Sequence, residues 1–141
     1  MRHGFIKVAT ATPSVKVADC THNADKILNL INKAHEEGVH LLVLPELCVT
    51  SYTCQDLFHQ QSLLESAQDN AVRIASKVPR NMVVVYGAPI EFRGKIHNCA
   101  IVASAGKVLG IVPKINIPNY QEYYEQRWFT PALPNEELIE F

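Results

Sequence analysis

The feature that most constrains the fold of this chain is a pair of short, almost wholly apolar runs. Each run is preceded by a segment with the spacing of an amphipathic helix. The runs are His40–Leu44 and Met82–Tyr86, and the helical segments span residues 23–37 and 61–77. Runs of this length are typical of strands buried on both faces of a sheet. A further strand is expected over 5–11, where apolar and polar residues alternate. The first part of the chain therefore predicts strands that alternate with helices.

The rest of the chain predicts strands without intervening helices. The second apolar run is expected to end at Gly87, and two more strands are expected over 95–103 and 107–112, joined by glycine-containing turns. A last short strand is expected at Glu137–Phe141. The order β-α-β-α-β-β-β predicts one mixed α/β unit with helices over at least one face of the sheet.

Composition excludes several classes of protein. Of the 141 residues, 48% are hydrophobic and 19% are charged, which supports a packed core and argues against disorder. The formal net charge is −1, which argues against general nucleic-acid binding. The apolar runs are too short to span a bilayer, and the N-terminus lacks the apolar stretch of a secretory signal. We therefore expect a cytoplasmic protein without a membrane partner.

The cysteines and histidines favour neither a disulfide scaffold nor a metal site. The six histidines are scattered, and no two cysteines form a C-x-x-C pair. We interpret the four cysteines as reduced thiols, although Cys48 and Cys54 are close enough in sequence to leave a disulfide open. The four are Cys20, Cys48, Cys54 and Cys99.

Two charged residues stand directly after apolar strands. Glu46 follows the first apolar run and Lys114 follows the strand expected at 107–112. Ligands of α/β proteins gather at the carboxyl ends of strands, so a shared sheet would let the two side chains meet as a base and a cationic stabiliser. The alternative is a non-catalytic scaffold on which both are surface charges. Their separation in space distinguishes these interpretations.

Two motifs resemble those of a known enzyme superfamily. The first resembles the glutamate motif of the nitrilase (carbon–nitrogen hydrolase) superfamily, and the second resembles the lysine segment of one branch, the glutaminase domain of glutamine-dependent NAD+ synthetases. The chain departs from these patterns at Leu44, where many nitrilases have Phe, and at Ser51, where many synthetases have Gly. The residues that carry the resemblance are Leu44-Pro45-Glu46, Tyr52 and Asp56-Leu57-Phe58, then Pro113 to Tyr120 and Glu125 to Phe129.

The resemblance implies a fold and a set of roles. The fold would be part of a four-layer α-β-β-α sandwich, with a mixed sheet and helices on the outer faces. Glu46 would be the general base, Lys114 would stabilise the oxyanion, and Glu125 would hold the lysine and orient the substrate. Tyr52 and Tyr120 would line the pocket for L-glutamine.

Each of these roles has a structural alternative. Glu125 could simply pair with Arg127 or Lys114 on a loop, and Tyr120 and Tyr123 could be core aromatics. Arg127 is expected to anchor the proline-rich segment rather than to bind substrate.

The resemblance also implies a nucleophilic cysteine that follows the lysine, yet no cysteine follows Lys114 in this chain. We therefore expect residues 1–141 to be the N-terminal portion of a glutaminase domain, truncated before its nucleophile and without the synthetase domain. The chain alone is expected to be inactive, and none of its own cysteines is expected to substitute.

The parent protein would release ammonia from L-glutamine and use it to amidate deamido-NAD+. The alternative is another nitrilase-type amidase. No cofactor is expected in this chain, whereas ATP and Mg would bind the missing synthetase domain. Nitrilase-like domains associate through their helical layers, so we also expect a homo-oligomer.

Overall fold

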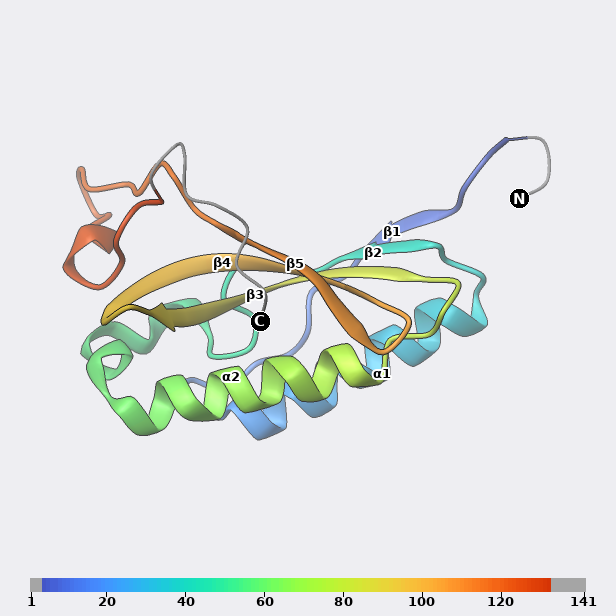
Figure 1. Cartoon of the computed structure of the whole chain (residues 1–141), viewed down its shortest axis with the longest axis horizontal. Helices are drawn as coiled ribbons and strands as arrows, with labels where there is room; N and C mark the ends of the chain where they lie inside the picture. Colours follow the sequence, from blue (N-terminus) through green and yellow to red (C-terminus); the bar gives the residue numbers. More distant parts are fainter. Residues whose placement is uncertain (1–3, 133–141) are drawn as a thin grey trace.

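A computed structural model describes residues 4–132, so the strand expected at Glu137–Phe141 lies outside the described residues. The order of strands and α-helices matches the expected β-α-β-α-β-β-β (Figure 1). Two short 3₁₀ helices, η1 and η2, were not expected. In chain order the elements are β1 (Val8–Thr10), α1 (Cys20–Glu36), β2 (Leu41–Val43), η1 (Tyr52–His59), α2 (Gln61–Ser76), β3 (Val83–Phe92), β4 (Lys95–Ser104), β5 (Lys107–Pro113) and η2 (Glu125–Arg127).

The strands form one mixed five-stranded sheet in the order β1-β2-β3-β4-β5. β1, β2 and β3 pair in parallel, and the β3–β4 and β4–β5 pairs are antiparallel. β5 therefore points the same way as β2. The segments that leave these two strands emerge at the same end of the sheet, which is the arrangement in which Glu46 and Lys114 could meet.

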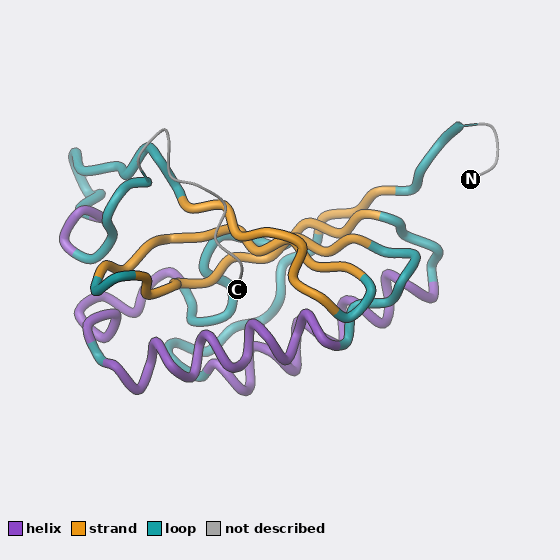
Figure 2. Tube along the Cα trace, in the orientation of Figure 1, coloured by secondary structure: helices purple, strands orange, loops and turns teal. Residues whose placement is uncertain are grey.

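Both α-helices lie side by side on one face of the sheet (Figures 1 and 2). Arg73 of α2 contacts Asp25 of α1 at 2.5 Å, and the Tyr86 hydroxyl of β3 donates to the Ala71 carbonyl of α2 at 2.7 Å. Side chains alternate between the faces of a sheet, so the neighbours of Tyr86 in β3 point away from the helices.

The face away from the helices is only partly covered by residues 4–132. Leu42 of β2 is 1% exposed, whereas the adjacent Val43 is 38% exposed. The prediction that β2 is buried on both faces was therefore wrong, because the described residues supply two layers, one of strands and one of helices. The expected sandwich has two further layers. None of the described helices is long and apolar enough to cross a membrane.

Local signals in the sequence set the ends of the first helix. The Asp19 carboxylate accepts a hydrogen bond from the His22 N–H at 3.0 Å and so caps the start of α1. Gly38 follows its end with φ of +74°, a conformation that glycine adopts without steric cost. Between these ends the apolar stripe of Ala24, Ile27 and Ile31 is fully buried.

The prediction that a strand ends at Gly87 was wrong. β3 continues to Phe92, because every residue from Val83 to Phe92 pairs with β4. Gly87 has a different role: a Cβ at this position would lie 2.2 Å from the Leu47 backbone nitrogen and 2.8 Å from the Glu46 Cα. The missing side chain lets the segment after β2 approach the strand on the face away from the helices.

Candidate active site

Glu46 is carried against β3 by the turn that follows β2. The Leu44 N–H donates to the Val85 carbonyl at 2.8 Å, and the Val49 N–H donates to the Gly87 carbonyl at 3.2 Å. The backbone between these two hydrogen bonds occupies the space that Gly87 leaves open. The turn therefore presents Glu46 at the carboxyl end of the sheet.

Buried hydrogen bonds tie the same turn to the start of α1. Asn23 is fully buried, and its Nδ2 donates to the Val49 carbonyl at 3.0 Å. The Ala18 N–H donates to the Thr50 carbonyl at 2.8 Å. A buried polar group without a partner is costly, so these bonds favour one conformation of the turn.

The turn also holds backbone conformations that side chains rarely adopt. Leu47, Ser51 and Gln55 all have positive φ. Ser51, with φ of 79° and ψ of 149°, lies close to a region that is essentially restricted to glycine. Strain of this kind typically costs about 1–3 kcal/mol and clusters at functional sites.

Replacing Ser51 by Gly should therefore stabilise the chain. We expect the free energy of unfolding to rise by roughly 1 kcal/mol, because the relief of strain exceeds the conformational entropy that glycine loses on folding. The Ser51 hydroxyl contributes little, since its contacts with the Thr53 N–H and the Thr53 hydroxyl are long, at 3.4 and 3.3 Å. Urea unfolding of the 141-residue chain measures the change.

The matched control for this experiment is Ser66→Gly within α2, which should destabilise by about 1 kcal/mol. The exchange of Ser for Gly should then raise the free energy of unfolding at position 51 and lower it at position 66. A decrease in stability for Ser51→Gly as large as that for Ser66→Gly would contradict the interpretation.

Lys114 meets Glu46 directly. The Lys114 N–H donates to the Asn98 carbonyl at 2.8 Å, which extends the pairing of β4 with β5 by one residue. The Lys114 Nζ then lies 2.7 Å from the Glu46 Oε1. The expectation that these two side chains meet is confirmed, and the arrangement of two separate surface charges is excluded.

Glu125 completes a cluster of two carboxylates around one ammonium. Its carboxylate comes from η2, is 3% exposed, and lies 3.0 Å from the Lys114 Nζ. The Tyr52 hydroxyl of η1 donates to the Glu125 Oε1 at 2.5 Å. Of the two partners considered for Glu125, the structure selects Lys114.

The surroundings of Lys114 keep it charged. Partial burial lowers its pKa, but the hydrogen bonds to Glu46 and Glu125 outweigh this effect and leave the pKa raised above 10.5. For Tyr52, burial and then the hydrogen bond to the Glu125 carboxylate raise the pKa, so the phenol stays neutral and acts as a donor. The cluster therefore holds a permanent cation next to carboxylates.

A second ion pair joins η1 to η2. The Arg127 guanidinium contacts the Asp56 carboxylate at 2.6 and 2.8 Å, and the Trp128 Nε1 donates to the same carboxylate at 2.9 Å. The hydrogen bonds from Arg127 and Trp128 hold the pKa of Asp56 well below its usual range. Arg127 thus anchors the segment that carries Glu125, as the sequence predicted.

A cavity of about 200 Å³ lies beside this cluster. Its walls come from η1 and from the segment around η2, and Tyr52 and Glu125 both contribute to it. Tyr120 does not line it and is 64% exposed, so its assignment to substrate binding stays a prediction. The lining residues are Tyr52, Thr53, Gln55, Glu122, Tyr123, Tyr124, Glu125 and Trp128.

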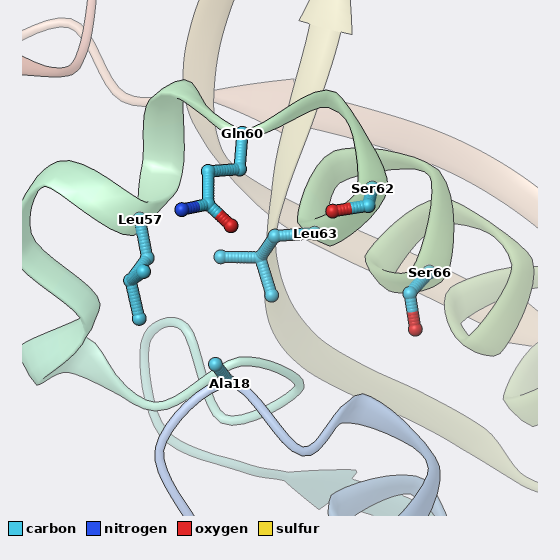
Figure 3. Close-up of a pocket in the computed structure, with 6 residues that line it drawn as sticks. All are labelled: Ala18, Leu57, Gln60, Ser62, Leu63 and Ser66. Carbon is cyan, nitrogen blue, oxygen red and sulfur yellow. The ribbon is translucent and has the colours of Figure 1, made fainter.

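A second cavity, of about 250 Å³, opens at the start of α2 and is separate from the charged cluster. Figure 3 shows its lining side chains, which come from the segment before α1, from η1, from the residue between η1 and α2, and from α2. None of them is titratable, so this cavity offers no acid or base. They are Ala18, Leu57, Gln60, Ser62, Leu63 and Ser66.

Sequence reasoning did not identify Asn98 as part of the site. Asn98 is 3% exposed, and its Nδ2 donates to the Glu46 Oε1. A signal was available, because Asn98 is a polar residue next to the apolar run Cys99–Val102 of a buried strand. Buried polar groups need partners, and here the partner is the carboxylate expected to act as the base.

None of the four cysteines is placed as a reactive thiolate. All four are free and buried, which leaves Cys48 and Cys54 unpaired. Burial raises the pKa of Cys48 to about 11 and that of Cys99 to about 12, and it raises the pKa of Cys20 and Cys54 as well. The Cys48 Sγ faces the Gly87 carbonyl at 3.8 Å. A thiol that stays protonated is a poor nucleophile.

Comparison with known proteins agrees with the geometry. The carbon–nitrogen hydrolase family profile matches residues 7–139. The glutamine-dependent NAD+ synthetase of Mycobacterium tuberculosis is 37% identical over 132 residues, which is 93% of this chain and 19% of that protein. The mouse protein of the same name is 32% identical over 137 residues, 96% of this chain and 19% of that protein.

Solved structures show the same relationship. A glutamine-dependent NAD+ synthetase from Cytophaga hutchinsonii superposes with a TM-score of 0.87 and 32% identity, over 93% of this chain and 22% of that one. An amidase from Nesterenkonia shares the fold, with a TM-score of 0.78 and 23% identity, over 100% of this chain and 53% of that one. This chain thus spans only about a fifth of the length of the synthetases that it matches.

Proposed function

This chain belongs to the carbon–nitrogen hydrolase family, and on that premise we propose that its Glu46, Lys114 and Glu125 form part of a glutamine amidohydrolase site. The observation that carries the proposal is the contact of the Lys114 Nζ with the Glu46 Oε1 at 2.7 Å and the Glu125 Oε2 at 3.0 Å. A fixed cation beside a partly exposed carboxylate is the arrangement that amide hydrolysis needs. Similarity to glutamine-dependent NAD+ synthetases supports glutamine as the substrate.

The proposed reaction divides the work between these residues. The base, Glu46, takes the proton of a cysteine thiol while the sulfur bonds to the amide carbon, and Lys114 stabilises the negative charge that forms on the carbonyl oxygen. The carbon–nitrogen bond then breaks, and Glu46 returns the proton to the departing ammonia. Water, activated by Glu46, cleaves the thioester and restores the thiol, so that glutamine and water give glutamate and ammonia.

The other members of the site orient these groups. Glu125 forms a second ion pair with Lys114, and Tyr52 donates a hydrogen bond to Glu125. The cavity that these two residues share with aromatic side chains provides an apolar wall with polar tips, which suits the side chain of an amino acid.

The nucleophile in this proposal is a cysteine outside the four in the chain. We propose that residues 1–141 supply the base and the lysine of a glutaminase domain, and that the thiol and the synthetase domain are provided elsewhere in the protein. The ammonia would amidate deamido-NAD+ in that domain, with ATP and Mg. In residues 4–132 no three His, Cys, Asp or Glu side chains are arranged to hold a metal ion.

The isolated 141-residue chain is expected to release no ammonia from glutamine above background. Its four thiols are buried and have raised pKa values, so none of them attacks the amide. A coupled ammonia assay on the purified chain tests whether it releases ammonia and whether any of its own thiols attacks the amide. The full-length gene product is the positive control. Sustained turnover by the chain that thiol alkylation abolishes would overturn our placement of the nucleophile.

A further inference from the structure

The two oxygens of the Glu46 carboxylate have different surroundings. The Oε1 accepts from the Lys114 Nζ at 2.7 Å and from the Asn98 Nδ2. Within residues 4–132 no donor reaches the Oε2. The side chain is 43% exposed, so the Oε2 is the oxygen that remains available to another group.

The sheet fixes the backbone of Asn98. This residue lies in β4 opposite Pro89 of β3, and its backbone carbonyl accepts from the Lys114 N–H at 2.8 Å. Its backbone therefore fixes the start of the lysine segment, while its amide holds the Glu46 carboxylate. One buried residue thus sets the relative position of the base and the cation.

The chemistry of an amide suits this position. A second cation on the Oε1 would hold the carboxylate equally well, but it would weaken Glu46 as a base through its charge. Asn98 supplies a donor without adding a net charge. Its burial also leaves its side chain little freedom to reorient.

We propose that Asn98 is a positioning residue that, together with Lys114, occupies the Glu46 Oε1 and so makes the Oε2 the atom that takes the proton. This inference rests on the proposed glutaminase function. It assigns the proton transfer to one oxygen of the base and gives Asn98 a role that acts through Glu46.

The test is glutamine hydrolysis by the full-length gene product carrying Asn98→Leu, which has a similar volume but no donor. We expect kcat to fall by roughly tenfold to a hundredfold, a part of what a general base contributes, while KM changes less than about threefold. Asn98→Ser, whose side chain is too short to reach Glu46, should lower kcat to the same extent. It takes the place of Asn98→Leu if the leucine variant does not fold. The matched control is Asn70→Leu, which alters a buried asparagine of α2 that bonds the Ser66 carbonyl far from the site.

A double-variant cycle separates positioning from a general loss of structure. Glu46→Asp keeps a carboxylate but withdraws it from Asn98, so adding Asn98→Leu to it should lower kcat by less than about threefold. Two results would overturn the role of Asn98 and leave the proposed function standing. One is a kcat of the double variant that falls by the product of the two single losses, and the other is a kcat of Asn98→Leu within about threefold of wild type. A wild-type protein that releases no ammonia from glutamine overturns the proposed function, and this inference with it.

Discussion

Replacing Glu46 by Gln or Lys114 by Ala in the full-length gene product should lower the glutaminase rate by at least about a hundredfold. The first change removes the proton acceptor and keeps the shape of the side chain. The second removes the cation that faces the developing negative charge, and it leaves the buried carboxylate of Glu125 without its ion-pair partner. On the proposed function, synthesis of NAD+ from added ammonia should persist in both variants, because that step would take place in the proposed synthetase domain and not at this site.

The controls for these variants are the same exchanges at exposed positions outside the site. Glu65→Gln on α2 and Lys107→Ala at the start of β5 should leave the rate of ammonia release unchanged. Steady-state assays with glutamine and with ammonium chloride are compared for each variant. If either site variant keeps more than about a tenth of the glutamine-dependent rate, its proposed role is wrong.

Titration of Lys114 should not contribute to the pH dependence of the site below about pH 10. Its folded-state pKa is raised above the ordinary 10.5, so its side chain is fully charged below that value and loses its charge only as the pH rises through the folded pKa. A loss of activity between pH 8 and 10 would therefore come from another group. We expect its midpoint to be the same in wild type and in Lys114→Arg when the rate of ammonia release is measured against pH.

The sequence was sufficient to predict the order of the strands and helices, and it placed Glu46 and Lys114 after strands where a shared sheet would let them meet. Each residue follows an apolar strand, and the parallel orientation of β2 and β5 places both at one end of the sheet. This prediction depends on strand direction alone. The roles of Glu125 and Tyr52 needed the resemblance, because nothing in their spacing indicates that η1 and η2 lie together.

Other features depend on contacts between distant segments and could not be derived from local patterns. Gly87 has the pattern of a strand end, but its neighbour in space is the Leu47 backbone, 40 residues earlier in the chain. The hydrogen bond of Asn98 reaches Glu46 across 52 residues. The exposed side of β2 depends on which face the helices cover, and the apolar run does not distinguish one covered face from two.

Replacing Gly87 by Ala should be among the most damaging single-methyl changes in the chain. The new Cβ would lie 2.2 Å from the Leu47 nitrogen and 2.8 Å from the Glu46 carbonyl carbon, and its three nearest neighbours are all backbone atoms. Backbone held by the Leu44 and Val49 hydrogen bonds to β3 has little room to move. We expect a loss of about 3 kcal/mol or more in the free energy of unfolding, the upper range for overpacking.

The same change should also uncouple the base from its partners. Relief of the clash requires the turn to move away from β3, which takes Glu46 away from Asn98 and Lys114, so the glutaminase rate of any folded variant should fall with the stability. Gly110→Ala in β5 is the matched control, because its Cβ would meet no atom within 4 Å and should change stability by less than about 1 kcal/mol. Urea unfolding of the 141-residue chain and ammonia release by the full-length protein measure the two effects. Equal stability of the two alanine variants would show that Glu46 does not depend on the close approach at Gly87.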